Sequence, residues 1–158
     1  MSLLNLINMW EMMGDKIKIQ DEVLFRQIHP KSFHGGVPGS DRFRPSDLDM
    51  NLLSVDRSAL TSAMNAHALF VSTGRQSAAV FGVEVREFAA ETIACHEDPI
   101  AADEKAPANV AHALADYSTH TSGQQKVVAK RLTRLAIARG CLFQAGSDEK
   151  AVTTAAQF

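Results

Sequence analysis

Cysteine is scarce in this sequence, and its scarcity excludes two kinds of scaffold. Of 158 residues only Cys95 and Cys141 are cysteines, and they form no CxxC pair. A disulfide-rich domain and a structural zinc site both need several clustered cysteine or histidine ligands. We therefore expect two reduced thiols, no metal site and no certain cofactor.

Long apolar runs are missing as well. No stretch approaches the roughly 18 consecutive apolar residues that a membrane-spanning helix requires. The first residues also lack the basic and apolar regions of a secretory signal peptide. We expect a cytoplasmic protein without a membrane partner.

The chain has no surplus of positive charge. Its 16 lysines and arginines face 18 acidic residues, which gives a net charge of −2. A nucleic-acid-binding surface usually shows as a basic excess, so a nucleic-acid partner is not expected. The GxSxG, Walker, HExxH and EF-hand motifs are also missing, which argues against the common hydrolases, nucleotide triphosphatases and zinc proteases.

What the sequence does contain is the apolar periodicity of one globular domain. Apolar residues make up 46% of the chain and charged residues 22%, as in ordinary globular domains. Alternating or short apolar runs predict strands over residues 16–20, 23–28, 52–55, 78–85 and 92–96, and over 110–117, where the alanines would also suit a helix. Helical spacing predicts helices over residues 3–13, 59–71 and 124–139.

The order of these elements favours an α+β fold. We expect a single domain over residues 15–143, with a small bent sheet that is mixed or antiparallel and with a C-terminal helix. An N-terminal amphipathic helix over residues 1–14 would precede it, and residues 144–158 would form a disordered tail.

The two predicted helices inside the domain have expected caps and apolar faces. Asp56 or Ser58 would cap the first, whose inner face would carry Leu60, Met64, His67 and Val71. Ser122 would open the second and Gly140 would stop it, with Val128, Leu132 and Leu135 as its apolar stripe.

The N-terminal segment offers an apolar surface. Leu3, Leu6, Ile7, Trp10 and Met13 recur at helical spacing, and three methionines lie among them. Such a stripe either packs on the domain or is covered by another chain, because exposed apolar patches of this kind are unusual. We expect a homo-oligomer or a protein partner to cover Leu3–Met13.

Residues 26–54 hold the highest density of polar side chains. Arg26 lies within an apolar strand, where a guanidinium must reach solvent or find an anion. The following loop is rich in glycine, whose backbone N–H groups can bind an anion, and Arg42 and Arg44 add positive charge. Arg26, Arg42 and Arg44 are therefore predicted to bind a small anionic ligand such as a phosphate or carboxylate.

Three side chains are candidates for catalysis: His29, His112 and Ser54. His112 shares a predicted strand with Asp116, and residues four apart lie on one face of a strand. A carboxylate there could orient the imidazole as a base, while the alternative for His112 is a structural role. His29 precedes the glycine-rich loop, and Ser54 closes the polar segment.

A family resemblance extends over about residues 23–70. The sequence there reads Leu24-Phe25-Arg26, then GSDRFRP at residues 39–45, then LLSV at residues 52–55, before a helix with Ala59 and Ala63. It resembles the RES-type toxins, which have an arginine in an early strand, an Arg-Phe-Asn-Pro-like loop, and a strand ending in serine before an alanine-bearing helix. The order HP…FRP…LSV is also similar to that of small uncharacterised bacterial proteins, which implies no activity.

The resemblance to the RES-type toxins implies an ADP-ribosyltransferase-like fold, which holds NAD in a cleft between two small sheets. NAD would then be a substrate. Arg26 and Arg44 would contact its phosphates, Ser54 would orient the ribose, and His29 or His112 would be the titratable group.

A second class of function competes with this one. Leu53 stands where the family has an aromatic residue, and the family's acidic residue at the start of the helix has no counterpart here. These departures, the modest charge and the apolar segment 3–13 suggest a non-catalytic interaction module, such as an immunity or antitoxin-like partner protein.

Overall fold

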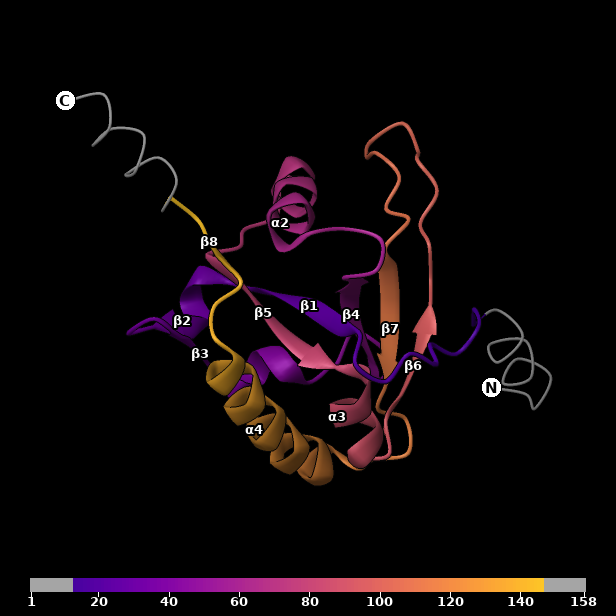
Figure 1. Ribbon diagram of the computed structural model, residues 1–158, viewed down its shortest axis with the longest axis vertical. Coiled ribbons are helices and arrows are strands. Elements are labelled where there is room, and N and C mark those ends of the chain that lie inside the picture. Colours follow the sequence, from indigo (N-terminus) through magenta and orange to yellow (C-terminus); the bar gives the residue numbers. More distant parts are fainter. Residues whose placement is uncertain (1–12, 147–158) are drawn as a thin grey trace.

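A six-stranded antiparallel sheet is the centre of the molecule in the computed structural model, which describes residues 13–146 (Figure 1). Its strands lie in the order β6-β7-β4-β1-β5-β8. Their bounds are β1 (Val23–Ile28), β4 (Leu52–Arg57), β5 (Ala79–Glu84), β6 (Ala94–Glu97), β7 (His112–Asp116) and β8 (Phe143–Gln144). The expected α+β class is confirmed, and the sheet is antiparallel throughout.

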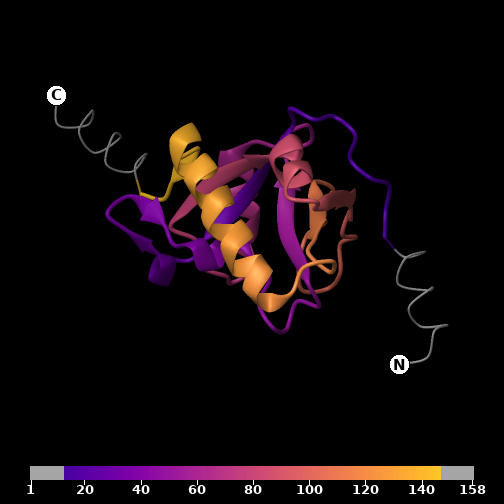
Figure 2. The same cartoon turned by 90° about the horizontal axis from the view of Figure 1, so that it is seen from below.

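Helices cover the two faces of the sheet unequally. Helix α2 (Ala63–Ser72) lies on one face, and helices α3 (Val85–Ala90) and α4 (Ser122–Arg139) lie on the other (Figures 1 and 2). Between β1 and β4 the chain forms two short 3-10 helices, η1 (Pro30–Ser32) and η2 (Ser40–Phe43). They flank a hairpin of β2 (Phe33–His34) and β3 (Val37–Pro38).

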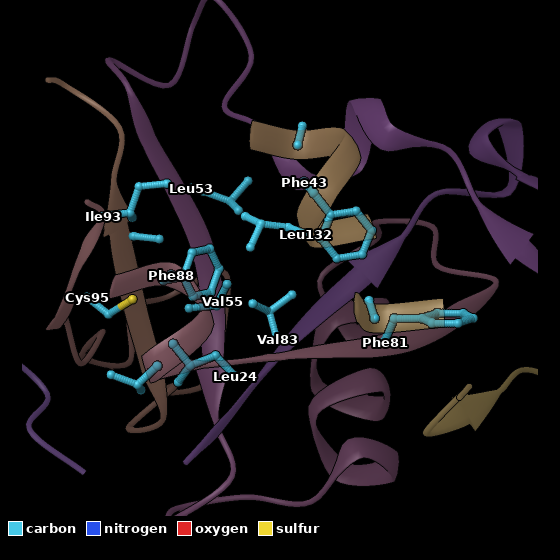
Figure 3. Close-up of a cluster of buried hydrophobic side chains, with 14 of the residues drawn as sticks. Leu24, Phe43, Leu53, Val55, Phe81, Val83, Phe88, Ile93, Cys95 and Leu132 are labelled. Carbon is cyan, nitrogen blue, oxygen red and sulfur yellow. The ribbon is translucent and has the colours of Figure 1, made fainter. Parts of the chain in front are cut away.

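The main core lies between the sheet and helices α3 and α4. Strand alternation points every second side chain to this face. Figure 3 shows these side chains meeting in one cluster: Leu24 of β1, Leu53 and Val55 of β4, Phe81 and Val83 of β5, with Phe43, Phe88 and Leu132 from the helices. A smaller cluster on the α2 face contains Phe25, Ala66 and Val80.

The strand pairing in the sheet is short at one place, the junction of β1 with β4. These strands pair only at Leu24 with Arg57 and at Phe25 with Asp56. By contrast, β1 pairs with β5 along all six residues, and β4 pairs with β7 along five. The sheet therefore consists of two three-stranded halves, β6-β7-β4 and β1-β5-β8, that separate beyond Phe25.

Of the predicted strands, the one over residues 16–20 is wrong, and all the others except 23–28 differ from the structure by one or two residues at their ends. Residues 16–20 make only an isolated bridge, at Lys16 with His96, because the chain turns at residues 20–21 to begin β1 and leaves room for no further pairing. Ile17 is buried, while Ile19 is 57% exposed. The predicted strand over residues 78–85 ends at Glu84, which begins α3 through a capping box with Glu87.

The predicted helix over residues 59–71 begins too early. Asp56 belongs to β4, and the N-cap is Ser62, whose hydroxyl accepts the Asn65 N–H at 3.1 Å. The residue that this helix buries is Ala66. Three of the predicted inner residues are exposed: Leu60, Met64 and Val71.

The C-terminal part mostly follows the prediction. Helix α4 is capped by Thr121 rather than Ser122 and ends at Gly140, whose φ of 99° suits glycine. Leu135 was expected in its apolar stripe but is exposed. The predicted tail starts too early, because Gln144 pairs with Ala79 in β8.

Residues 1–12 and 147–158 lie outside the described part of the chain, and so does nearly all of the predicted helix over Leu3–Met13. Self-association through that segment stays a prediction. Within residues 13–146, no helix combines the length and apolarity needed to cross a membrane.

The two leucines of α4 give a matched test of this core. Leu132 is fully buried, whereas Leu135 is 40% exposed on the same helix. Leu132→Ala should lower the free energy of unfolding by about 2–5 kcal/mol, because it leaves a cavity in the main core. Leu135→Ala should change it by less than about 1 kcal/mol. Urea unfolding followed by circular dichroism measures both, and equal losses would contradict the described packing.

Candidate functional site

A central cavity of about 410 Å³ lies on the α2 face of the sheet. Its floor comes from β1, β4 and β7, and its walls come from α2 and from residues 98–111, the long connection between β6 and β7 (Figure 1). The floor carries the polar residues Arg26, Gln27, Ser54, Asp56 and His112, and Asn109 adds an amide from the wall. Ser54 and Asp56 face the cavity because they alternate with the core residues Leu53 and Val55.

His112 is held by a carboxylate at the edge of this cavity. Its Nδ1 lies 3.0 Å from Asp98 Oδ2 and 3.1 Å from the Asp98 carbonyl oxygen. With Nδ1 donating to Asp98, the lone pair of the neutral ring is on Nε2. The predicted partner Asp116 is wrong, because its carboxylate accepts the Ser118 N–H instead.

Asp56 is a buried carboxyl group beside His112. It is 9% exposed, and its Oδ1 accepts a hydrogen bond from Asn109 Nδ2 at 2.9 Å. Burial raises the pKa of Asp56, and the Asn109 hydrogen bond and the charges of His112 and Arg26 only partly oppose this effect. The carboxyl group therefore holds its proton more strongly than an exposed aspartate does.

A second cavity of about 380 Å³ adjoins the first and is lined by basic side chains. Arg26, Arg42, Arg75 and His29 line it, and no aspartate or glutamate of the described residues does. We call it the arginine cavity. It shares Arg26, Gln27, Phe70 and Arg75 with the central cavity, so the two spaces have a common wall.

Arg26 spans the gap between the two halves of the sheet. Its Nε donates to the Arg42 carbonyl oxygen at 2.6 Å, and its Nη1 donates to the Ser54 carbonyl oxygen at 3.0 Å. Burial, together with the adjacent Arg42 guanidinium, lowers the pKa of Arg26 to about 10. Arg26 is still charged at neutral pH, and two guanidinium groups therefore lie close together in a partly buried place.

Hydrogen bonding in this region is incomplete. Two buried side-chain nitrogen atoms of the described residues have no hydrogen-bond partner, Gln27 Nε2 and Arg42 Nε, and both residues line the arginine cavity. Arg42 Nε lies 3.3 Å from the Asp41 carboxylate, which is engaged by the Ser32 hydroxyl. Arg75 is exposed, with its guanidinium 5.4 Å from the centre of the Phe70 ring.

The structure places most of the predicted site residues in the two cavities. His29, Arg26 and Arg42 line the arginine cavity, and Ser54 and His112 line the central one. Arg44 lines neither. The glycine-rich loop also lies outside both, since Gly35 and Gly36 form the β2–β3 turn and the Gly39 N–H donates to the Ser32 carbonyl oxygen.

Several residues of the site were missed by sequence reasoning: Gln27, Asp56, Arg75, Asp98 and Asn109. Asp98 and Asn109 lie in the connection between β6 and β7, and only the pairing of these strands brings the connection over β4. Gln27 alternates with Arg26 in a recognised strand, so its face was predictable. No motif signals Arg75.

Comparison with known proteins identifies no relative, since no family model, curated protein or solved structure matches the chain. Among residues 13–146, no three histidine, cysteine, aspartate or glutamate side chains are placed to hold a metal ion. Cys95 is buried, and burial raises the pKa of its thiol to about 12, so it stays protonated.

The buried carboxyl group predicts a pH-dependent stability difference. Because the pKa of Asp56 is higher in the folded state than in the unfolded state, its contribution to stability falls as pH rises from the unfolded pKa through the folded one. Asp56→Asn should therefore raise the melting temperature by a few degrees at pH 7 and by little at pH 3.5. Thermal unfolding by circular dichroism at both pH values measures this, with the exposed Asp47→Asn as control. An equal effect at both pH values would contradict the desolvation argument.

Proposed function

We propose that this chain binds an anionic, nucleotide-like small molecule, with its phosphates in the arginine cavity and its sugar and heterocycle in the central cavity. NAD is the candidate ligand. The observation that carries the proposal is the arginine cavity itself, where Arg26, Arg42 and Arg75 gather without an acidic lining residue.

Electrostatics supports an anion in this place. Arg26 and Arg42 repel one another in a partly buried environment, and the neighbouring carboxylate Asp41 is shared with Ser32. A phosphate would neutralise this charge and accept hydrogen bonds from guanidinium groups, which match its geometry. Arg75, at the exposed rim, would complete the contact.

The dimensions and position of the central cavity support a heterocycle and a sugar there. Its volume is within the range of small-molecule sites, and Phe25 and Phe70 contribute apolar surface beside the polar floor. It lies over the junction of the two half-sheets. The resemblance to RES-type toxins adds weight, because their fold holds NAD between two small sheets.

The binding test uses Arg75 rather than Arg26. Arg26 joins β1, η2 and β4 through backbone carbonyl groups, so its removal would destabilise the free protein. Arg75→Ala changes an exposed side chain. NAD or ADP-ribose at about 100 times its Kd should stabilise the folded wild type by about 2.7 kcal/mol, a shift of a few degrees in melting temperature, and Arg75→Ala should lose most of that shift.

The matched control is Arg131→Ala, on α4 at the opposite face of the sheet, where the guanidinium pairs with Glu91. This variant should keep the full ligand-induced shift. If millimolar NAD, ADP-ribose and ADP all leave the wild-type melting temperature unchanged, the chain does not bind this class of ligand.

The His112–Asp98 pair supports a hydrolytic step on bound NAD as part of the same proposal. The oxygen of water would bond to the ribose C1′ while the C1′–N bond breaks, and the electron pair of that bond would leave with nicotinamide. The proton of the water would pass to Nε2 of His112, and Asp98 would stabilise the imidazolium that forms.

Release of nicotinamide measures this step directly. Wild-type protein should release nicotinamide above background, His112→Asn should reduce the rate by at least about 100-fold, and Asp98→Asn should reduce it less. Both variants should still show the NAD-induced thermal shift. Tight binding of NAD without turnover by the wild type would reject hydrolysis and leave a binding protein.

A further inference from the structure

Gln27 occupies the wall between the two cavities. It is the fifth residue of β1, and its side chain faces α2 because it alternates with Arg26 and Ile28. It is only 8% exposed, yet it lines both the central and the arginine cavity. A polar group in this position would contact a ligand that extends from the arginine cavity into the central cavity.

The amide of Gln27 has an unused hydrogen-bonding atom. Its Oε1 accepts the Ser77 hydroxyl at 2.7 Å, and its Nε2 has no partner. The same hydroxyl lies 3.1 Å from the Ala79 carbonyl oxygen. If the amide is turned over, Nε2 donates to Ser77 Oγ while Ser77 donates to Ala79, and Oε1 becomes the unpaired atom.

One amide atom is therefore unpaired in either orientation. Such a buried atom costs folding free energy, and native proteins pair nearly all of them. By contrast, the buried side chains of Gln125 and Thr133, on the α4 face, do have partners: Gln125 donates to Asn51, and Thr133 donates to the Ala129 carbonyl oxygen. The unpaired atom of Gln27 thus points to a partner that the chain itself does not supply.

We infer that Gln27 binds a ribose hydroxyl of the nucleotide ligand. This inference rests on the proposed function. In a nucleotide the pentose connects the phosphate to the base, so it would lie at the wall between the arginine cavity and the central cavity. Its 2′ and 3′ hydroxyl groups both donate and accept, so they satisfy whichever amide atom faces them. The site would then discriminate ribonucleotides from dideoxynucleotides.

The experiment compares ADP with 2′,3′-dideoxy-ADP by isothermal titration calorimetry. Wild type should bind ADP at least about 10-fold more tightly, because the dideoxy ligand leaves a buried amide atom unpaired. Gln27→Met has a side chain of similar length and no amide, so the two ligands should bind it within about 2-fold of each other. Gln20→Met, at an exposed residue that lines neither cavity, should keep the wild-type ratio.

The outcomes separate this inference from the proposed function. If wild type binds ADP and its dideoxy analogue equally, Gln27 does not bind the ribose, while nucleotide binding stands. If wild type binds neither ligand, both proposals fail. Without ligand, Gln27→Met should melt at or above the wild-type temperature, because Ser77 can still donate to Ala79. A clear fall in melting temperature would show that the amide is structural and would overturn the inference.

Discussion

The Arg26 guanidinium joins two half-sheets that their own backbones barely connect. Strands β1 and β4 share only two register pairs, and beyond Phe25 the Arg26 side chain reaches the Ser54 carbonyl oxygen of β4 and the Arg42 carbonyl oxygen of η2. A charged side chain thus replaces ladder hydrogen bonds. Tyr117 also anchors η2, because its buried hydroxyl donates to the Phe43 carbonyl oxygen.

The Arg26 bridge, in place of backbone pairing between β1 and β4, explains the position of the two cavities. A continuous ladder between β1 and β4 would bring the two strands to the usual spacing of about 4.8 Å and close the space beside Gln27. The side-chain bridge holds the strands together without closing it. The arginine cavity is therefore a consequence of the separation of the strands, and its positive charge is a consequence of the group that bridges them.

Local patterns in the sequence predicted where strands and helices form better than they predicted which residues contact one another in the fold. Strand β1 was predicted with its observed bounds, because a short apolar run between turns has one simple interpretation. The start of α2 was wrong because Ser58 and Ser62 are equally good caps by residue type, and its inner face was wrong because packing on the sheet selects that face. The predicted pair of His112 with Asp116 failed for a related reason: spacing within a strand identifies a shared face, whereas the actual partner Asp98 depends on how β6 pairs with β7.

The two faces of the sheet differ in how completely their buried polar groups are paired. On the α4 face an apolar cluster is closed and the buried Gln125 and Thr133 are paired. On the α2 face a desolvated carboxyl group and an unpaired amide border the same space, with two guanidinium groups at its edge. Folding alone gains nothing from such groups, since apolar side chains of similar size would cost less. Departures from packing rules that are concentrated at one place are typical of sites that bind something. The α4 face of the sheet thus carries the closed apolar core, and the α2 face presents the polar groups.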